Sequence, residues 1–347
     1  MKKSFTVVSA ASLLVLSACG GNYGSSENEN SDSDSGSGSN SGGGDASYTL
    51  QVGIVVSEND PMYAGLEQFK ENVEEETDGD LEVELFPNSS LGDTPGIQEQ
   101  AKAGSNVGTL SDAAILGDYQ EEIGILQGPY LFENYDEIQK VTNSDLFQGW
   151  SDDLAENENL QILSFNWYQG TRNMVTDNAI ETPEDLNGQS IRTIGSDIFL
   201  ETMKAMGANP TGLDWAEVYT GIQQGAIDGA EAQQSAAYEA SLYEVSDHYS
   251  KTKHIQLITG LVVSADWFEG LPEEYQDIVL EEAKQGGTYA SEQVIDTSEE
   301  YESQMEDEGM TIVEPELEPF QQATEDVYEE FDGYPELREE ILEIIES

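Results

Sequence analysis

Two alternating hydrophobic runs flank one helical run at the start of the folded part of the chain. Apolar side chains alternate over residues 48–56 and again over residues 81–85, which is typical of β-strands. Between them, apolar positions recur at helical spacing over residues 62–73, and Asp60 followed by Pro61 is a typical helix start. This strand–helix–strand order predicts a β-α-β unit, and therefore a mixed or parallel sheet.

Short strands and helices continue to alternate through the rest of the chain. The pattern predicts further strands at residues 160–165, 174–176, 190–194, 255–263 and 311–313. It predicts helices ending near residue 103 and covering residues 197–206, 215–224, 318–331 and 336–346. Asp214 and Glu217 have the spacing of a capping box at the start of one of these helices. The alternation as a whole indicates the α/β class.

One helical segment is much longer than the others. Apolar residues recur at helical spacing from Leu271 to Met305, and at about 1.5 Å per residue an unbroken helix of this length crosses a whole domain. Gly286 and Gly287 lie near its middle, where a glycine pair can introduce a kink. The sequence therefore predicts a long, domain-spanning helix with a bend at the glycine pair.

The composition is strongly acidic, with 71 Asp and Glu residues against 12 Lys and Arg residues in 347. Such a chain repels phosphate groups, which argues against nucleic-acid binding. Because 37% of the residues are hydrophobic, the acidic side chains belong to a packed protein rather than a disordered tail. High salt or an alkaline external medium would each explain the acidity, which describes the solvent more than the ligand.

The N-terminus has the features of an export signal. Two lysines precede a mostly apolar run of residues 5–16, which is short for a membrane-spanning helix. Leu16-Ser17-Ala18-Cys19 is similar to a bacterial lipobox, so we expect a lipoprotein signal peptide at residues 1–18 and lipidation of Cys19, the only cysteine. An ordinary secretory signal is the alternative. The Gly- and Ser-rich residues up to 47 then form a flexible acidic tether.

Arginine is the rare residue that suggests a binding site. The chain has three arginines, and Arg172 and Arg192 lie twenty positions apart while Arg338 is near the C-terminus. A guanidinium group binds a carboxylate through two parallel hydrogen bonds, which lysine cannot do. A structural ion pair is the alternative role in so acidic a chain. We interpret Arg172 and Arg192 as candidates for binding a small organic carboxylate.

Several motifs around these arginines resemble one family, the DctP-type solute receptors of tripartite ATP-independent periplasmic (TRAP) transporters. The central motifs are GTR at 170–172, TPEDLNGQSIR at 182–192 and GANPTGLDWAEVYTGIQQGAIDG at 207–229. The same pattern includes SLGD at 90–93, PYLF at 129–132, LYEVSDHY at 242–249 and LPEEYQDIV at 271–279. The resemblance therefore covers nearly all of residues 48–310.

The resemblance implies a two-domain periplasmic-binding-protein (venus-flytrap) fold with crossing hinge strands. We expect domain I at residues 48–168 plus about 257–296, and domain II at residues 169–256 plus about 297–347 with the C-terminal helices. The implied protein is an extracytoplasmic, membrane-anchored receptor and a monomer, which carries an organic acid to the TRAP membrane permease. A receptor for an ATP-driven importer and an exported hydrolase remain as alternatives.

The resemblance also assigns roles to individual residues. The arginine of the family's IR motif binds the ligand carboxylate bidentately, which matches Arg192, and the arginine of the GTR motif adds a contact, which matches Arg172. Asp112 matches the region that meets polar groups of the ligand. Trp215 and Tyr219 lie in the family's helix motif and are expected to line or support the pocket.

One position departs from the family pattern. Many sugar-acid-binding members have the sequence DGQENP, in which the asparagine contacts the carboxylate, whereas this chain has Ala232 in that place. Gln233 or Gln234 is the expected substitute, with Gln233 the first choice. The departure indicates a pocket unlike that of the sialic-acid receptors.

Enzymatic chemistry has little support in the sequence. His248 and His254 lack metal-ligand spacing, and no G-x-S-x-G or phosphate-binding loop is present. Cys19 is assigned to lipidation, so no cysteine nucleophile remains. We therefore expect no catalytic residue, no metal and no cofactor.

Overall fold

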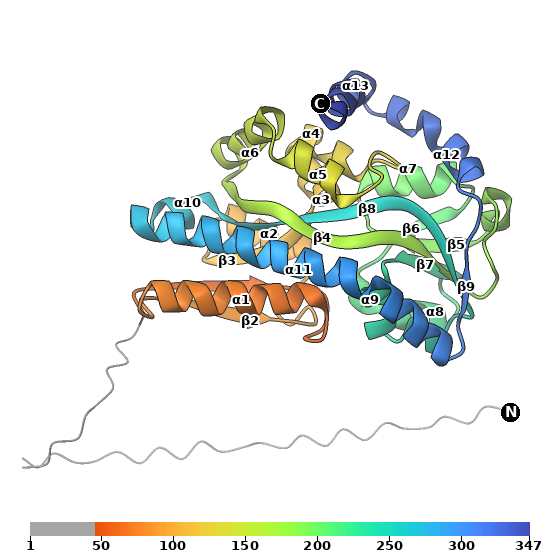
Figure 1. The fold of residues 1–347 in the computed structure, drawn as a ribbon, viewed down its shortest axis with the longest axis horizontal. Helices are drawn as coiled ribbons and strands as arrows, with labels where there is room; N and C mark the ends of the chain where they lie inside the picture. The colour runs from red at the N-terminus through yellow and green to blue at the C-terminus, as the bar shows by residue number, and fades with distance from the viewer. Residues whose placement is uncertain (1–45) are drawn as a thin grey trace, which may run out of the picture. The chain divides into compact units, whose positions relative to one another are not determined.

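The computed structural model describes residues 46–347. The predicted signal peptide at residues 1–18, Cys19 and nearly all of the tether lie outside the described residues. Within residues 46–347 the strands and helices form a mixed α/β structure (Figure 1), which confirms the predicted fold class.

A nine-stranded mixed sheet runs through the described part of the chain, in the order β2-β1-β3-β8-β4-β7-β5-β6, with β9 paired to β8. β1 pairs in parallel with β2 and β3, so the predicted β-α-β unit is confirmed. β5 pairs in parallel with β6 and β7 at the other end of the sheet. The strands are β1 Tyr48–Gly53, β2 Leu81–Phe86, β3 Val107–Asp112, β4 Leu160–Thr176, β5 Ser190–Thr193, β6 Asn209–Gly212, β7 Gly229–Ala232, β8 His248–Ser264 and β9 Thr311–Val313.

The two central strands connect the two halves of the sheet. β4 and β8 have 17 residues each and run antiparallel to one another. One end of β8 pairs with β3, while the far end of β4 pairs with β7. Each strand therefore passes from one half to the other, as expected for crossing hinge strands. The predicted strands at 160–165 and 174–176 are both parts of the single strand β4.

Helices cover both faces of the sheet. Figure 1 shows α1 and α11 side by side on one face, with α5 and α6 on the other. The α-helices are α1 Pro61–Glu76, α2 Thr94–Lys102, α3 Ala113–Gly117, α4 Glu121–Gly124, α5 Tyr135–Thr142, α6 Asp145–Glu158, α7 Asp197–Ala205, α8 Val218–Gln223, α9 Gln234–Glu239, α10 Ala265–Glu269, α11 Glu273–Asp307, α12 Glu318–Thr324 and α13 Tyr334–Glu346. The 3₁₀ segments are η1 Ile125–Gln127, η2 Pro183–Leu186, η3 Trp215–Glu217, η4 Leu242–Glu244 and η5 Glu325–Glu330.

The long helix α11 is the predicted spanning helix, but the glycine pair does not interrupt it. α11 has 35 residues and remains α-helical through Gly286 and Gly287. A Cβ on Gly286 would lie 2.6 Å from the backbone oxygen of Gly65 in α1, and a Cβ on Gly287 would lie 2.4 Å from Asn166 Oδ1. The two glycines therefore allow α11 to approach α1 and β4 closely.

Helix starts differ from the sequence prediction in one place. Asp214 makes no side-chain cap on the following turn, so the predicted capping box is wrong, and residues 215–217 form a 3₁₀ turn before α8. Thr182 and Asp185 form a capping box instead, at the start of η2. Asp60 accepts a hydrogen bond from Met62 N at 2.9 Å, as predicted for the start of α1.

Three hydrophobic clusters hold the two halves together. The largest joins α1, β1, β2 and β3 to the crossing strands, with Trp167 fully buried in it. Two smaller clusters lie under β5, β7 and α7 and include Val175 and Met174 of β4. Because β4 contributes to all three clusters, the hinge strands belong to both cores.

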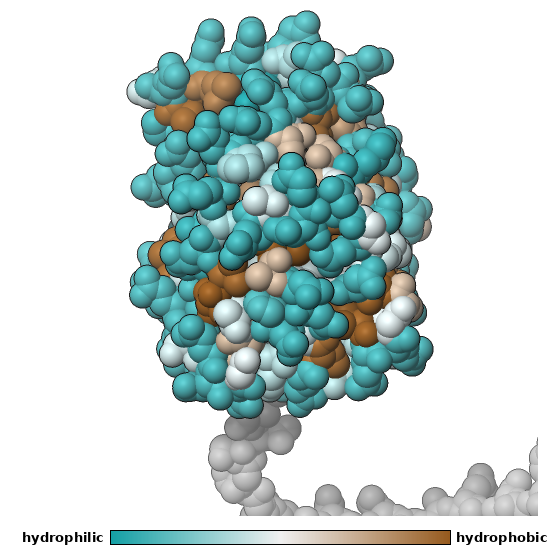
Figure 2. All heavy atoms as spheres, turned by 90° about the vertical axis from the view of Figure 1, so that its right-hand side faces the viewer, coloured by the Kyte–Doolittle hydropathy of each residue, from teal (hydrophilic) through white to brown (hydrophobic). Residues whose placement is uncertain are grey.

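The surface reflects the acidic composition. Figure 2 shows one face as mainly hydrophilic, with hydrophobic residues in small separate areas. Among the helices of residues 46–347, none combines the length and the apolar character needed to cross a bilayer.

Candidate functional site

A large cavity opens at the carboxyl ends of several strands from both halves of the sheet. Its volume is about 520 Å³. β3 ends at Asp112, β5 is followed by Ile194, and β7 is followed by Gln233, and all three of these residues line the cavity. Open α/β sheets bind ligands at the carboxyl ends of their strands. The site's position therefore follows from the topology of the sheet.

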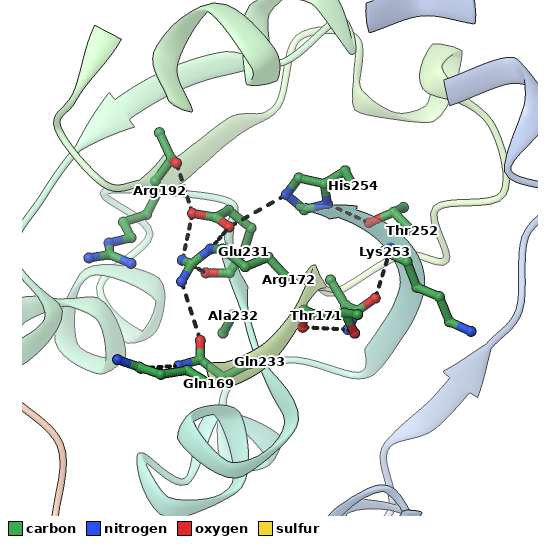
Figure 3. A network of polar contacts seen from close by, with 12 residues as sticks. Gln169, Thr171, Arg172, Arg192, Glu231, Ala232, Gln233, Thr252, Lys253 and His254 are labelled. Carbon is green, nitrogen blue, oxygen red and sulfur yellow. Dashed lines mark hydrogen bonds and ion pairs between the residues drawn. The ribbon is translucent and has the colours of Figure 1, made fainter. Parts of the chain in front are cut away.

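Arg192 presents an unused hydrogen-bonding edge to this cavity. It lies on β5 and is buried, and its Nε donates to Leu213 O at 2.8 Å. Its guanidinium carbon lies 5.3 Å from the ring centroid of Trp215. No hydrogen bond or ion pair within residues 46–347 engages its terminal nitrogens, and the guanidinium points away from Glu231 (Figure 3). Burial and the nearby charge of Arg172 lower the pKa of Arg192 to about 10, so it stays protonated at neutral pH.

Arg172 is already paired inside the protein. On β4, its Nε and Nη2 donate to the two carboxylate oxygens of Glu231, and Nη2 also donates to Glu231 O at 2.8 Å. Nη1 donates to Gln233 Oε1 at 3.2 Å. The side chains of Arg172 and Glu231 are 3% and 0% exposed, so this is a buried ion pair. In this structure Arg172 therefore forms a structural ion pair, which was the alternative role for the arginines.

Glu231 is the centre of a buried polar network that the sequence did not reveal. Thr193 Oγ1 donates to it at 2.8 Å, and His254 Nε2 lies 3.5 Å away (Figure 3). Burial alone would raise the pKa of Glu231, but the charge of Arg172 and the hydrogen bonds outweigh burial and hold that pKa well below its usual range. Burial lowers the pKa of His254, which keeps this imidazole neutral. Glu231 therefore carries a full negative charge beside Arg172.

Asp112 lies at the end of β3, on the opposite half of the sheet. Its Oδ1 accepts hydrogen bonds from Ala114 N and Ile115 N, both at 3.0 Å, and so caps α3. No residue of the described chain donates to Oδ2. Burial raises the pKa of Asp112 to about 6, although its hydrogen bonds and Arg172 act in the other direction. The cavity thus contains an acceptor that titrates near neutral pH.

Of the two glutamines after Ala232, Gln233 lines the cavity. Its amide donates to Gln169 Oε1 at 2.9 Å, and Gln169 is another lining residue. Gln234 instead donates to Glu302 on α11 at 3.0 Å. Ala232 is fully buried in a hydrophobic cluster. The structure therefore brings Gln233, and not Gln234, to the site.

The remaining candidates separate. Trp215 lines the cavity, whereas Tyr219 is not among the lining residues. Tyr219 packs against a hydrophobic cluster and its hydroxyl donates to Glu244 at 2.7 Å. Tyr219 is therefore placed to support the elements around the cavity and not to line it.

Further lining residues were missed by the sequence reading. Four carboxylates and two neutral side chains belong to this set: Asp93, Asp118, Asp214, Glu217, Gln169 and Thr259. Gln169 stands directly before the GTR motif, which is the one signal that could have suggested it. His248 and His254 are not part of the cavity lining, and within residues 46–347 no group of three or more His, Cys, Asp or Glu side chains is arranged to hold a metal.

The sequence model of the family described as bacterial extracellular solute-binding protein, family 7 (DctP) matches residues 52–333. The chain belongs to this family. Its TRAP-type members are periplasmic or extracytoplasmic solute receptors. The sialic acid-binding periplasmic protein SiaP of Vibrio cholerae is 27% identical over 289 residues, which are 83% of this chain and 90% of SiaP.

Solved TRAP solute-binding proteins share the two-domain fold of this chain. One from Escherichia fergusonii, in an apo open structure, is 39% identical with a TM-score of 0.76 and covers 86% of this chain and 99% of its own. One from Ochrobacterium anthropi with bound L-fuconate is 29% identical with a TM-score of 0.84 and covers 86% of this chain and all (100%) of its own. The predicted family and the predicted venus-flytrap fold are thereby confirmed.

Proposed function

We propose that this protein is the receptor of a TRAP-type transporter and that it binds the carboxylate of a small organic acid on the open edge of Arg192. One observation carries the proposal: Arg192 lines the cavity with both terminal nitrogens unengaged by the described chain, while Arg172 is already paired with Glu231. A guanidinium edge is well suited to two parallel hydrogen bonds with a carboxylate. Arg172 then acts mainly by positioning Gln233, because its charge is paired with Glu231.

The charges around the cavity restrict the class of acid. Glu231 offsets the charge of Arg172, which leaves Arg192 as the one cation in the lining that has no ion pair, although the charges of Glu231, Asp214 and Asp112 act on it. Asp112 presents an acceptor on the facing half, and four more carboxylates line the cavity. A second carboxylate on the ligand would meet these like charges. We infer that the ligand is a monocarboxylate whose other polar groups are hydroxyls or a cation able to donate to Asp112. The SiaP and L-fuconate relatives, both named for acids with a single carboxylate, support this class.

The structure has features of a closed receptor. Ser57 and Asn59, which follow β1, donate to Glu239 of α9 at 3.3 and 3.2 Å. The TM-score is higher with the L-fuconate complex than with the open structure, although the open structure has the higher sequence identity. In our proposal, ligand contacts from both halves favour this state, and the closed receptor then delivers the ligand to the membrane permease.

The domain boundaries stated above stay a proposal. The path of β4 and β8 supports exchange between the halves near residues 169 and 257. α13 contacts α5, which favours assigning residues 334–346 to domain I rather than to domain II.

The remaining parts of the proposal concern anchoring and chemistry. We propose that Cys19 is lipidated and tethers a monomeric receptor, and that the protein converts no substrate and needs no cofactor. Metabolic labelling with a radioactive fatty acid tests the anchor: the wild-type protein should be labelled and the Cys19→Ala variant should not. A turnover assay with each ligand that binds tests the absence of catalysis, because recovery of unchanged ligand is expected.

The binding experiment starts from a thermal-shift screen of organic acids, since a ligand that binds only the folded protein raises its melting temperature. Calorimetry of the best acid with the Arg192→Lys variant then tests whether Arg192 binds the ligand carboxylate. Lysine keeps the charge but cannot bind bidentately, so affinity should fall at least about tenfold, a loss of about 1.4 kcal/mol or more. Wild-type affinity in the lysine variant, or a screen in which only neutral sugars shift the melting temperature, would contradict the proposal.

A further inference from the structure

A second cavity lies between the C-terminal helix α13, the 3₁₀ segment η5 and the loop after η1. Its volume is about 290 Å³, and it is lined by Pro129, Tyr130, Gln321, Gln322, Thr324, Glu325, Tyr328 and Arg338. It shares no lining residue with the large cavity. The family match ends at residue 333, so Arg338 lies beyond it.

Arg338 is the notable side chain of this cavity. It is half-buried, and its guanidinium carbon lies 4.5 Å from the ring centroid of Tyr328. Its Nε is buried without a hydrogen-bond partner, and no ion pair within residues 46–347 includes it. The terminal nitrogens likewise make no hydrogen bond within residues 46–347, and they are the donors left for an anion in the cavity, because Nε has no exposed surface. The site therefore has an unmet need for an anion or another strong acceptor.

The sequence of α13 keeps carboxylates away from Arg338. The helix contains glutamates at positions 336, 339, 340, 343 and 346. Side chains on a helix meet at spacings of three and four, and at those spacings Arg338 has Tyr334, Pro335, Ile341 and Leu342. A helix so rich in glutamate thus leaves its arginine without an intrahelical partner. Glu325 is the one carboxylate in the cavity lining; it is exposed and makes no ion pair with Arg338.

The walls around the guanidinium are held in place. Tyr328, on which Arg338 stacks, donates its hydroxyl to Pro129 O at 2.9 Å and is buried. Tyr130 has a backbone φ of 53°, and its hydroxyl donates to Thr252 O at 2.9 Å. Gln321 adds a neutral amide, whereas the amide of Gln322 donates to Glu318 at 3.1 Å. The cavity therefore exists before any ligand enters and offers one positive charge beside the neutral amide of Gln321.

We propose that this cavity is a second anion site, in which the terminal nitrogens of Arg338 bind the oxygens of a small carboxylate or inorganic oxyanion. The bound anion bridges α13 to η5 and to the loop at Pro129, and so stabilises the C-terminal helix. This inference goes beyond the receptor function, because it uses none of the residues of the large cavity.

The scarcity of arginine gives a direct test. In the protein labelled with ¹⁵N-arginine, three side-chain Nε–H signals are expected, and each is assigned with an Arg→Lys variant. Sodium acetate and sodium sulfate are titrated separately against sodium chloride at constant ionic strength. We expect the Arg338 signal to move saturably with one or both anions and to be insensitive to Arg192→Lys. The two titrations distinguish a carboxylate site from a site for inorganic oxyanions.

Glu325→Gln provides the matched variant. Removing this exposed charge from the rim should tighten anion binding at Arg338 roughly two- to fivefold, the range of an exposed charge interaction. The proposal is overturned if the Arg338 signal moves only as it does with chloride, or if Glu325→Gln alone shifts it and abolishes its response, since Glu325 would then be its partner. Movement of the Arg192 signal alone would leave the receptor proposal intact and refute the second site.

Discussion

Substitution of the two arginines of the large cavity by methionine should affect different properties: Arg172→Met should lower stability, and Arg192→Met should abolish ligand binding. Arg172→Met leaves the fully buried Glu231 with only Thr193 and the neutral His254. Removing one member of a buried pair typically costs 3–5 kcal/mol, because the other charge remains desolvated, so we expect a loss of about that size in the free energy of unfolding. Arg192→Met removes a cation that has no carboxylate partner in the described chain, and we expect a change of about 1 kcal/mol or less.

Urea denaturation without ligand measures the free energy of unfolding of each variant. Calorimetry with the acid found by screening measures its affinity for the ligand. Arg192→Met should be nearly as stable as wild type but fail to bind, whereas Arg172→Met should be unstable. The double variant Arg172→Met/Glu231→Gln removes the orphaned charge and should recover most of the stability, which makes the pair a double-mutant cycle. If Arg172→Met and Arg192→Met unfold at the same urea concentration, the assignment of Arg172 to a structural pair is refuted.

Two further predictions concern pH and packing. The folded-state pKa of Asp112 is raised from 3.8 to about 6, so its protonated form favours the fold and this contribution is lost as pH rises from about 4 to about 6. Asp112→Asn keeps an acceptor for the α3 cap but has no charge to bury, so it should be more stable than wild type by roughly 1–3 kcal/mol above pH 6 and no more stable below pH 4. Urea denaturation of both proteins at each pH measures this difference. A difference that stays constant with pH would contradict the prediction. Gly286→Ala should lower the free energy of unfolding by about 1–3 kcal/mol, because the added methyl would overlap Gly65 O. The control Gly149→Ala lies exposed in α6 with nothing within 4 Å of the added methyl, and it should raise the free energy of unfolding by about 0.5–1 kcal/mol. Equal melting temperatures for these two variants would show that the packing argument is wrong.

Periodicity located seven of the thirteen α-helices and six of the nine strands of residues 46–347, because their burial patterns are local. It did not predict β3, α3 to α6, α9 or α10. The alternation at residues 48–56 and the helical spacing at 62–73 each reflect one side of a single element facing a core. It failed where neighbours decide the structure. β6 and β7 are four residues each and have no periodic pattern of their own, so they were missed. Gly286 and Gly287 indicated a kink, but the close approach of α1 and β4 explains them.

The candidate site divides in the same way. Residue type alone pointed to Arg172 and Arg192, because arginine is rare in this chain and its planar group suits carboxylates, and the family resemblance then favoured Arg192 as the bidentate ligand. The expectation that the protein binds no nucleic acid also came from composition alone, because net charge does not depend on the fold.

Tertiary structure alone decided what Arg172 does. Its partner Glu231 is one of 71 acidic residues and lies 59 positions away, and the only local signal for it is the glutamate of the family pattern DGQENP, directly before Ala232. The pairing of β4 with β7 sets Met174 opposite Glu231 and brings the carboxylate to the arginine. The sequence determined which residues could bind an anion; strand pairing determined that, of the two arginines that line the cavity, Arg172 is neutralised by Glu231 and Arg192 is left without an ion pair.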